Sequence, residues 1–104
     1  MLRLPKNRLP THPGDMLARE FMDPLGMTQV ELARRIGVPF QRVNQIINGR
    51  RAMSPDTALR LARLFGTSPG FWLNLQQRWD LSQAINSDHA RDIGRIKPVS
   101  RRAS

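Results

Sequence analysis

Amide side chains suited to reading DNA bases gather in one short stretch of this chain. Glutamine and asparagine each carry a hydrogen-bond donor beside an acceptor, and this pair matches the N6 and N7 edge of adenine in the major groove. Gln41, Asn44 and Gln45 fall on one predicted helix. Because the first turns of such a helix enter the major groove, we expect these three residues to read bases.

Three neighbours belong to the same expected contact surface, and two of them have open roles. Pro39 lies in the first turn of the predicted helix. Arg42 could grip the O6 and N7 atoms of guanine or hold a phosphate, and the sequence does not decide between these roles. Phe40 could equally meet a thymine methyl group or pack against a neighbouring helix.

Four further residues are expected to hold the phosphate backbone and to set the register on DNA. Thr28 and Gln29 start the preceding helix, where free amides and the helix dipole favour an anion. Arg50 and Arg51 follow the reading helix and add positive charge. Contacts of this kind position a protein on DNA without reading its sequence.

The charge balance favours a polyanionic partner. The 104 residues hold 17 lysines and arginines against 8 acidic residues, a formal charge of +9. A generally basic protein with solvated charges is the alternative. Clustering favours DNA, because residues 28 to 51 contain five arginines and a single acid, Glu31. Two of these, Arg34 and Arg35, face outward on the first helix of the stretch, where charges are usually only solvated.

The reading helix and the helix before it form a predicted helix-turn-helix. Thr28 can cap the first helix, and Glu31 three residues later completes a capping box. Gly37 permits the left-handed backbone of a tight turn between the two helices. Ala33 is small where the helices cross, and four larger apolar residues are predicted to fill the space between them: Leu32, Ile36, Val43 and Ile46.

Capping residues and apolar spacing predict three more helices, over about residues 13–24, 54–66 and 68–85. His12 is the expected cap of the first of these. No strand pattern or internal repeat is present, so we predict one all-α domain over residues 12–87. Residues 1–11 carry three cations and two prolines. This composition indicates either a flexible basic arm or a leader without a role. Residues 88–104 are basic and poor in apolar side chains, so we expect a disordered tail.

The last predicted helix carries an apolar stripe formed by Phe71, Trp72, Leu75 and Trp79, and Leu81 and Ile85 could extend it. A domain of this size has limited interior in which to hide four large side chains. We therefore expect part of the stripe to meet a second copy of the chain in a homodimer. The alternative is that all four residues close the core of the monomer.

An enzyme is not expected. The chain has no cysteine and no tyrosine, and His12 and His89 lie in opposite terminal regions. Catalysis and metal binding need convergent reactive groups, so we predict neither, and no cofactor. No apolar run is long enough to cross a bilayer and the chain starts with no signal peptide, so we expect a cytoplasmic protein without a membrane partner.

Two stretches, TQVELARRIGV and NQIINGRR, resemble the XRE-type helix-turn-helix of phage repressors. Over residues 12–81 the chain is similar to HigA-type antitoxins, through HPGDMLAREFMDPLGMTQ, RVNQIINGRR and SPDTALRLARLFGTSPGFWLNLQQRWDL. This resemblance implies a five-helix bundle of the lambda-repressor-like type. It also implies that six residues lie where the family contacts DNA: Gln29, Phe40, Gln41, Arg42, Asn44 and Gln45. Arg50 and Arg51 follow them in the basic turn.

The resemblance further implies a homodimer that binds a palindromic operator upstream of its own genes. It implies as a second partner a HigB-type toxin, an RNase that acts on translated messages and that the antitoxin silences. A stand-alone XRE-type regulator without a toxin is the alternative. RNA binding is disfavoured, because the major groove of A-form RNA is too narrow to admit a helix.

Overall fold

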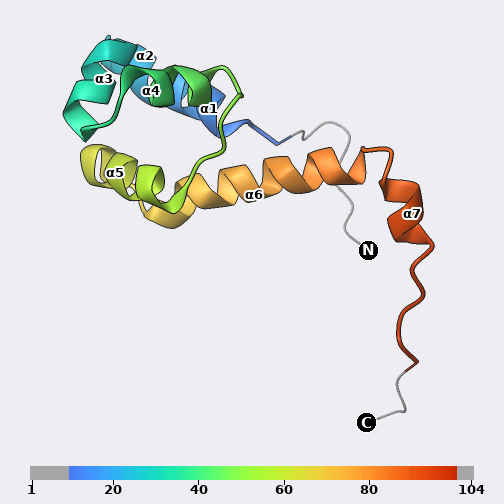
Figure 1. The fold of residues 1–104 in the computed structure, drawn as a ribbon. Helices are drawn as coiled ribbons and strands as arrows, with labels where there is room; N and C mark the ends of the chain where they lie inside the picture. The colour runs from blue at the N-terminus through green and yellow to red at the C-terminus, as the bar shows by residue number, and fades with distance from the viewer. Residues whose placement is uncertain (1–9, 101–104) are drawn as a thin grey trace.

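A computed structural model describes residues 10–100 of the chain, so most of the predicted basic arm and the last four residues lie outside the described part. Figure 1 shows helices joined by short loops, and no strand occurs within residues 10–100. This confirms the expected all-α fold. The helices are α1 (Pro13–Met16), continued by a π-helical turn (Leu17–Met22) and α2 (Asp23–Leu25), then α3 (Gln29–Ile36), α4 (Phe40–Ile47), α5 (Pro55–Phe65), α6 (Pro69–Ile85) and α7 (Ala90–Gly94).

The helices begin at the capping residues that the sequence predicts. The side-chain oxygens of Thr28, Ser54 and Ser68 each accept a hydrogen bond from the backbone N–H three residues later. The Nδ1 atom of His12 caps α1 by accepting from the Gly14 N–H at 2.9 Å. Gly37 closes α3 in the left-handed conformation, with a φ of 72°.

The core lies where α3, α4, α5 and α6 meet the first helical stretch. Leu32, Ala33 and Ile36 of α3 and Val43 and Ile46 of α4 are all buried, as predicted for the helix-turn-helix. Three residues from other helices complete the centre of this core and are fully buried: Leu17, Leu61 and Trp72.

A close approach between α1 and α4 depends on Gly14. A Cβ atom at this position would overlap the carbonyl oxygen of Ile46 and lie 2.8 Å from the Cα of Ile47. Only glycine therefore lets the first helix pack this tightly against the back of α4.

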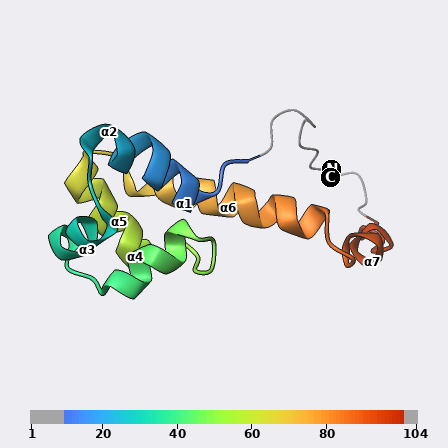
Figure 2. The same cartoon turned by 90° about the horizontal axis from the view of Figure 1, so that it is seen from above.

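The first helical stretch ends at Leu25 with Gly26 as its left-handed C-cap, close to the predicted end. One part of the chain differs from the expectation. Residues 90–94 form α7, although the sequence predicts no regular structure there. Figures 1 and 2 show that α6 projects well beyond the α3–α4 pair and carries α7 at its far end. Within the described residues, no helix is long and apolar enough to cross a membrane.

Candidate DNA interface

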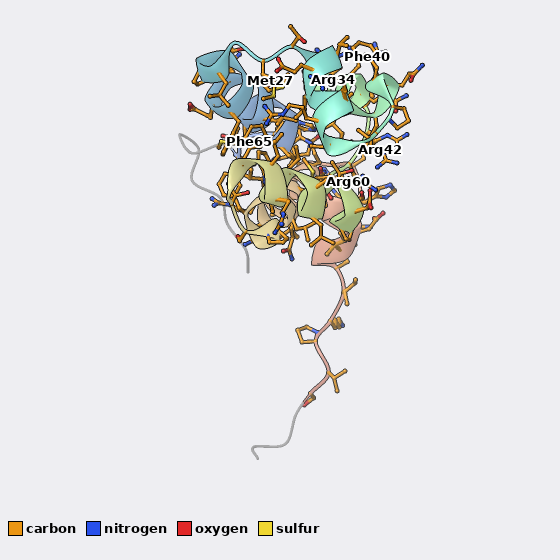
Figure 3. The ribbon with its side chains drawn as sticks, turned by 90° about the vertical axis from the view of Figure 1, so that its left-hand side faces the viewer. Met27, Arg34, Phe40, Arg42, Arg60 and Phe65 are labelled. Carbon is orange, nitrogen blue, oxygen red and sulfur yellow. The ribbon has the colours of Figure 1, made fainter. Side chains whose placement is uncertain are left out.

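The outward side of α4 carries most of the predicted contact residues. Pro39 caps this helix instead of lying in its first turn, and its ring is exposed. Gln41 is exposed, and Phe40 keeps 44% of its surface accessible. Phe40 is thus not part of the core, and Figure 3 shows its ring at the outer edge of α4. The ring is therefore accessible for the contact with a thymine methyl group, one of the two roles expected for Phe40.

Hydrogen bonds between side-chain amides connect α3 to α4. The Nδ2 atom of Asn44 donates to the Oε1 atom of Gln29 at 3.0 Å, and the Oδ1 atom of Asn44 accepts from the Nδ2 atom of Asn48 at 3.2 Å. Gln29 and Asn44 are half-buried. The amide of Asn44 therefore forms one hydrogen bond through its nitrogen and one through its oxygen, and the bond to Gln29 connects the two helices.

The loop after α4 adds positive charge next to a predicted base-reading residue. The Nε atom of Arg51 donates to the Oε1 atom of Gln45 at 2.9 Å. Arg50, beside it in the chain, is exposed. The structure thus joins a predicted phosphate-binding arginine to a predicted base reader, so a change at Arg51 also affects Gln45. Thr28, at the start of α3, accepts from the Glu31 N–H at 3.1 Å.

An acid in α5 connects α4 to the turn of the helix-turn-helix. The Oδ2 atom of Asp56 accepts from the NH1 atom of Arg42 and from the Nε atom of Arg60, both at 2.9 Å. The NH1 atom of Arg60 also donates to the Ile36 carbonyl oxygen at 2.7 Å. Neither Asp56 nor Arg60 was predicted as part of the site, because their partners Arg42 and Ile36 lie 14 and 24 residues away in the sequence.

The charge of Asp56 is secured by these arginines. The hydrogen bond from Arg60 is the largest cause that lowers the pKa of Asp56 below its ordinary value. Desolvation opposes this shift, and the hydrogen bond from Arg42 adds to it. Asp56 is consequently a carboxylate at neutral pH.

The predicted dimer stripe divides between core and surface. Trp72 is fully buried, and its Nε1 atom donates to the Thr67 Oγ1 atom at 2.8 Å, so the prediction of an interface role is wrong for Trp72. Its spacing along the helix could not distinguish the side of α6 that faces the chain's own core. The other three members of the stripe are half-buried: Phe71, Leu75 and Trp79.

Two apolar side chains further along α6 are the residues that could extend this stripe. Leu81 and Ile85 are 39% and 37% exposed, on the part of α6 that projects from the body. Leu81 also lines a shallow groove with Met53 and Leu73. Large apolar side chains in such a position are typical of protein contacts.

Within residues 10–100, no three potential ligands among histidine, aspartate and glutamate come together as a metal site would require. The fold and the amide-bearing α4 instead define a DNA-binding protein of the helix-turn-helix class. A family model described as Helix-turn-helix matches residues 19–72, more than half of the chain.

Similar proteins show which family of helix-turn-helix proteins the chain resembles. Antitoxin HigA-1 of Vibrio cholerae is 42% identical over 92 residues, which cover 88% of this chain and 86% of the relative. YbaQ of Escherichia coli K12, described as an uncharacterized HTH-type transcriptional regulator, is 39% identical over 94 residues, 89% of this chain and 83% of its own. The solved structure of antitoxin GraA in complex with its operator is 37% identical, has a TM-score of 0.82 and matches 95% of this chain and all of its own.

The chain belongs to the HigA-type antitoxins with an XRE-type helix-turn-helix. The expected fold of lambda-repressor-like type is confirmed by this membership. The family consists of DNA-binding regulators, in agreement with the expectation that the chain is not an enzyme.

Proposed function

We propose that this protein is an antitoxin that represses transcription by binding the operator of its own genes, and that it neutralises a HigB-type toxin. One observation carries the DNA-binding part. Helix α4 presents Phe40 and Gln41 as exposed residues and Arg42 and Gln45 as half-buried ones, while its opposite side packs into the core. The relative named for its operator complex supports the same activity. The protein would act where its DNA lies, in the cytoplasm.

The proposed active form is a homodimer. A palindromic operator mirrors the twofold symmetry of a dimer, which places one reading helix on each half-site. The contact would be made by the exposed and half-buried apolar side chains of α6, namely Phe71, Leu75, Trp79, Leu81 and Ile85. Trp72 is excluded from this surface because it lies in the core.

The deciding experiment measures binding of the purified full chain to the DNA upstream of its own reading frame and to a scrambled duplex at physiological salt. We expect a preference of about a thousandfold or more for the upstream DNA. The product of the adjacent reading frame is then added. A change in the DNA complex on this addition supports the antitoxin role. Strong, salt-sensitive binding to both duplexes without preference would reduce the protein to a basic helical chain and refute the proposal.

A stand-alone regulator is the second candidate, favoured by the similarity to YbaQ, which is described as a regulator and not as an antitoxin. It shares the operator-binding part of the proposal. The two candidates separate at the second step of the same experiment. Operator preference without any complex with the adjacent gene product assigns the chain to the stand-alone class.

A further inference from the structure

The environment of Arg42 differs from that of the other arginines near α4. Its guanidinium donates through NH1 to Asp56 at 2.9 Å, and the side chain is only 28% exposed. Asp56 is itself held by Arg60, whose second bond goes to the backbone carbonyl of Ile36. Figure 3 shows Arg42 and Arg60 converging at the edge where α4 faces α5. Arg42 is therefore bonded to α5 through Asp56, and Arg60 connects that acid to the end of α3.

A fixed arginine is suited to a planar, directional ligand. A guanidinium has five N–H donors in a rigid fork, and Asp56 occupies only one corner of it. The free edge can still donate two parallel hydrogen bonds, the pattern that the O6 and N7 atoms of guanine accept. Because the side chain is already ordered, less conformational entropy is lost when this pair forms.

The same arrangement is unfavourable for holding a phosphate. Phosphate contacts depend on net positive charge, and Arg42 shares the Asp56 carboxylate with Arg60, so the two guanidiniums together keep only one net positive charge. Arg50 is exposed and next to α4, which suits a backbone contact better. Charge and geometry thus favour the base-reading role of Arg42, one of the two roles that the sequence left open.

We propose that Arg42 reads a guanine in each half-site and that Asp56 is a positioning residue that orients its guanidinium. This inference rests on the proposed DNA-binding function and specifies one of its base contacts. Asp56 does not touch DNA in this scheme. Arg60 supports Asp56 from behind by anchoring it to the end of α3.

The test starts from duplexes that the full chain selects from a randomised library. Each guanine is replaced in turn by 7-deazaguanine, which keeps Watson–Crick pairing but lacks the N7 acceptor. For the unmodified protein we expect a loss of about 5- to 150-fold at one guanine of each half-site. Arg42→Ala should bind modified and unmodified duplexes alike at that position, because it removes the guanidinium that donates to N7.

Asp56→Ala and Asp56→Asn separate positioning from a merely structural role. Both should lose most of the sensitivity to 7-deazaguanine at the same position while binding scrambled DNA at least as well, because a negative charge is removed. A purely structural role would weaken binding to every duplex equally and would overturn the positioning claim. Arg63→Ala removes an exposed arginine of α5 as a matched control and should keep full guanine sensitivity.

Two further outcomes are distinguishable. If Arg42→Ala weakens binding to selected and scrambled duplexes equally and no guanine loses affinity on modification, Arg42 holds a phosphate and the inference is wrong. If the library yields no preferred duplex at all, the proposed operator-binding function is wrong, and the inference about Arg42 is wrong with it.

Discussion

Gln41 and Asn44 lie on the same helix with similar side chains but in different states. Gln41 is exposed, whereas the amide of Asn44 bonds to Gln29 and Asn48. A free amide can meet adenine without breaking a bond inside the protein, so Gln41 is the stronger base-reading candidate of the two. Asn44 contributes first by fixing α4 against α3. Its Nδ2 atom keeps a second N–H and its Oδ1 atom a second lone pair, so Asn44 can contact a base while it stays bonded to Gln29 and Asn48.

We expect Gln41→Ala to weaken binding to the preferred duplex by about 1–3 kcal/mol and to leave binding to scrambled DNA unchanged, because it removes a base contact only. Fluorescence anisotropy on both duplexes measures this difference.

The matched control for Gln41 is Arg50→Ala, since Arg50 is exposed and Arg51 is bonded to Gln45. Its loss should be equal on both duplexes, and the slope of log affinity against log salt should fall by about one. If the two variants behave alike, the division into reading and positioning residues does not hold.

At the scale of helices, α1 packs closely against the back of α4, the reading helix. We expect Gly14→Ala to lower the free energy of unfolding by about 1–3 kcal/mol, because the new methyl group meets the backbone of Ile46 and Ile47, which cannot move aside as a side chain would. Urea denaturation measures the change.

Gly70→Ala tests whether this loss is specific to the α1–α4 contact. A Cβ at Gly70 would meet its nearest neighbours at 3.9 and 4.0 Å, which is ordinary contact distance. Because alanine is a better helix former than glycine, this control should be neutral or slightly stabilising. A Gly14→Ala protein as stable as the unmodified chain would contradict the close packing of α1 on α4.

Helix boundaries were predictable from the sequence because capping links residues only a few positions apart, as between Ser54 and Thr57. The contacts that organise the site connect different helices. Asn44 meets Gln29 across 15 residues and Arg60 meets Ile36 across 24, so both depend on how helices cross. For the same reason apolar spacing identified the stripe on α6 but placed Trp72 at an interface instead of in the core.

At the scale of the whole molecule, the described part is elongated, with extents of 55 × 29 × 24 Å. Figures 1 and 2 place α7 and residues 95–100 at the opposite end of α6 from α3 and α4. Exposed cations in this segment include Arg91, Arg95 and Lys97. They lie at the opposite end of α6 from the reading helix of their own chain.

The projecting end of α6 is the place at which dimerisation can be tested. We expect the full chain to be a dimer at micromolar concentration by light scattering, and Leu81→Glu to shift it toward monomer, because a carboxylate replaces one of the exposed apolar side chains of α6. Loss of the dimer should weaken binding to a two-half-site duplex by about a hundredfold or more, since the second half-site no longer benefits from high effective concentration.

Gln83→Glu adds the same charge at another exposed position of α6 and should leave both mass and affinity unchanged. A monomeric unmodified chain at micromolar concentration would remove the dimer from the proposed function, while leaving the guanine contact of Arg42 to be tested on a single half-site.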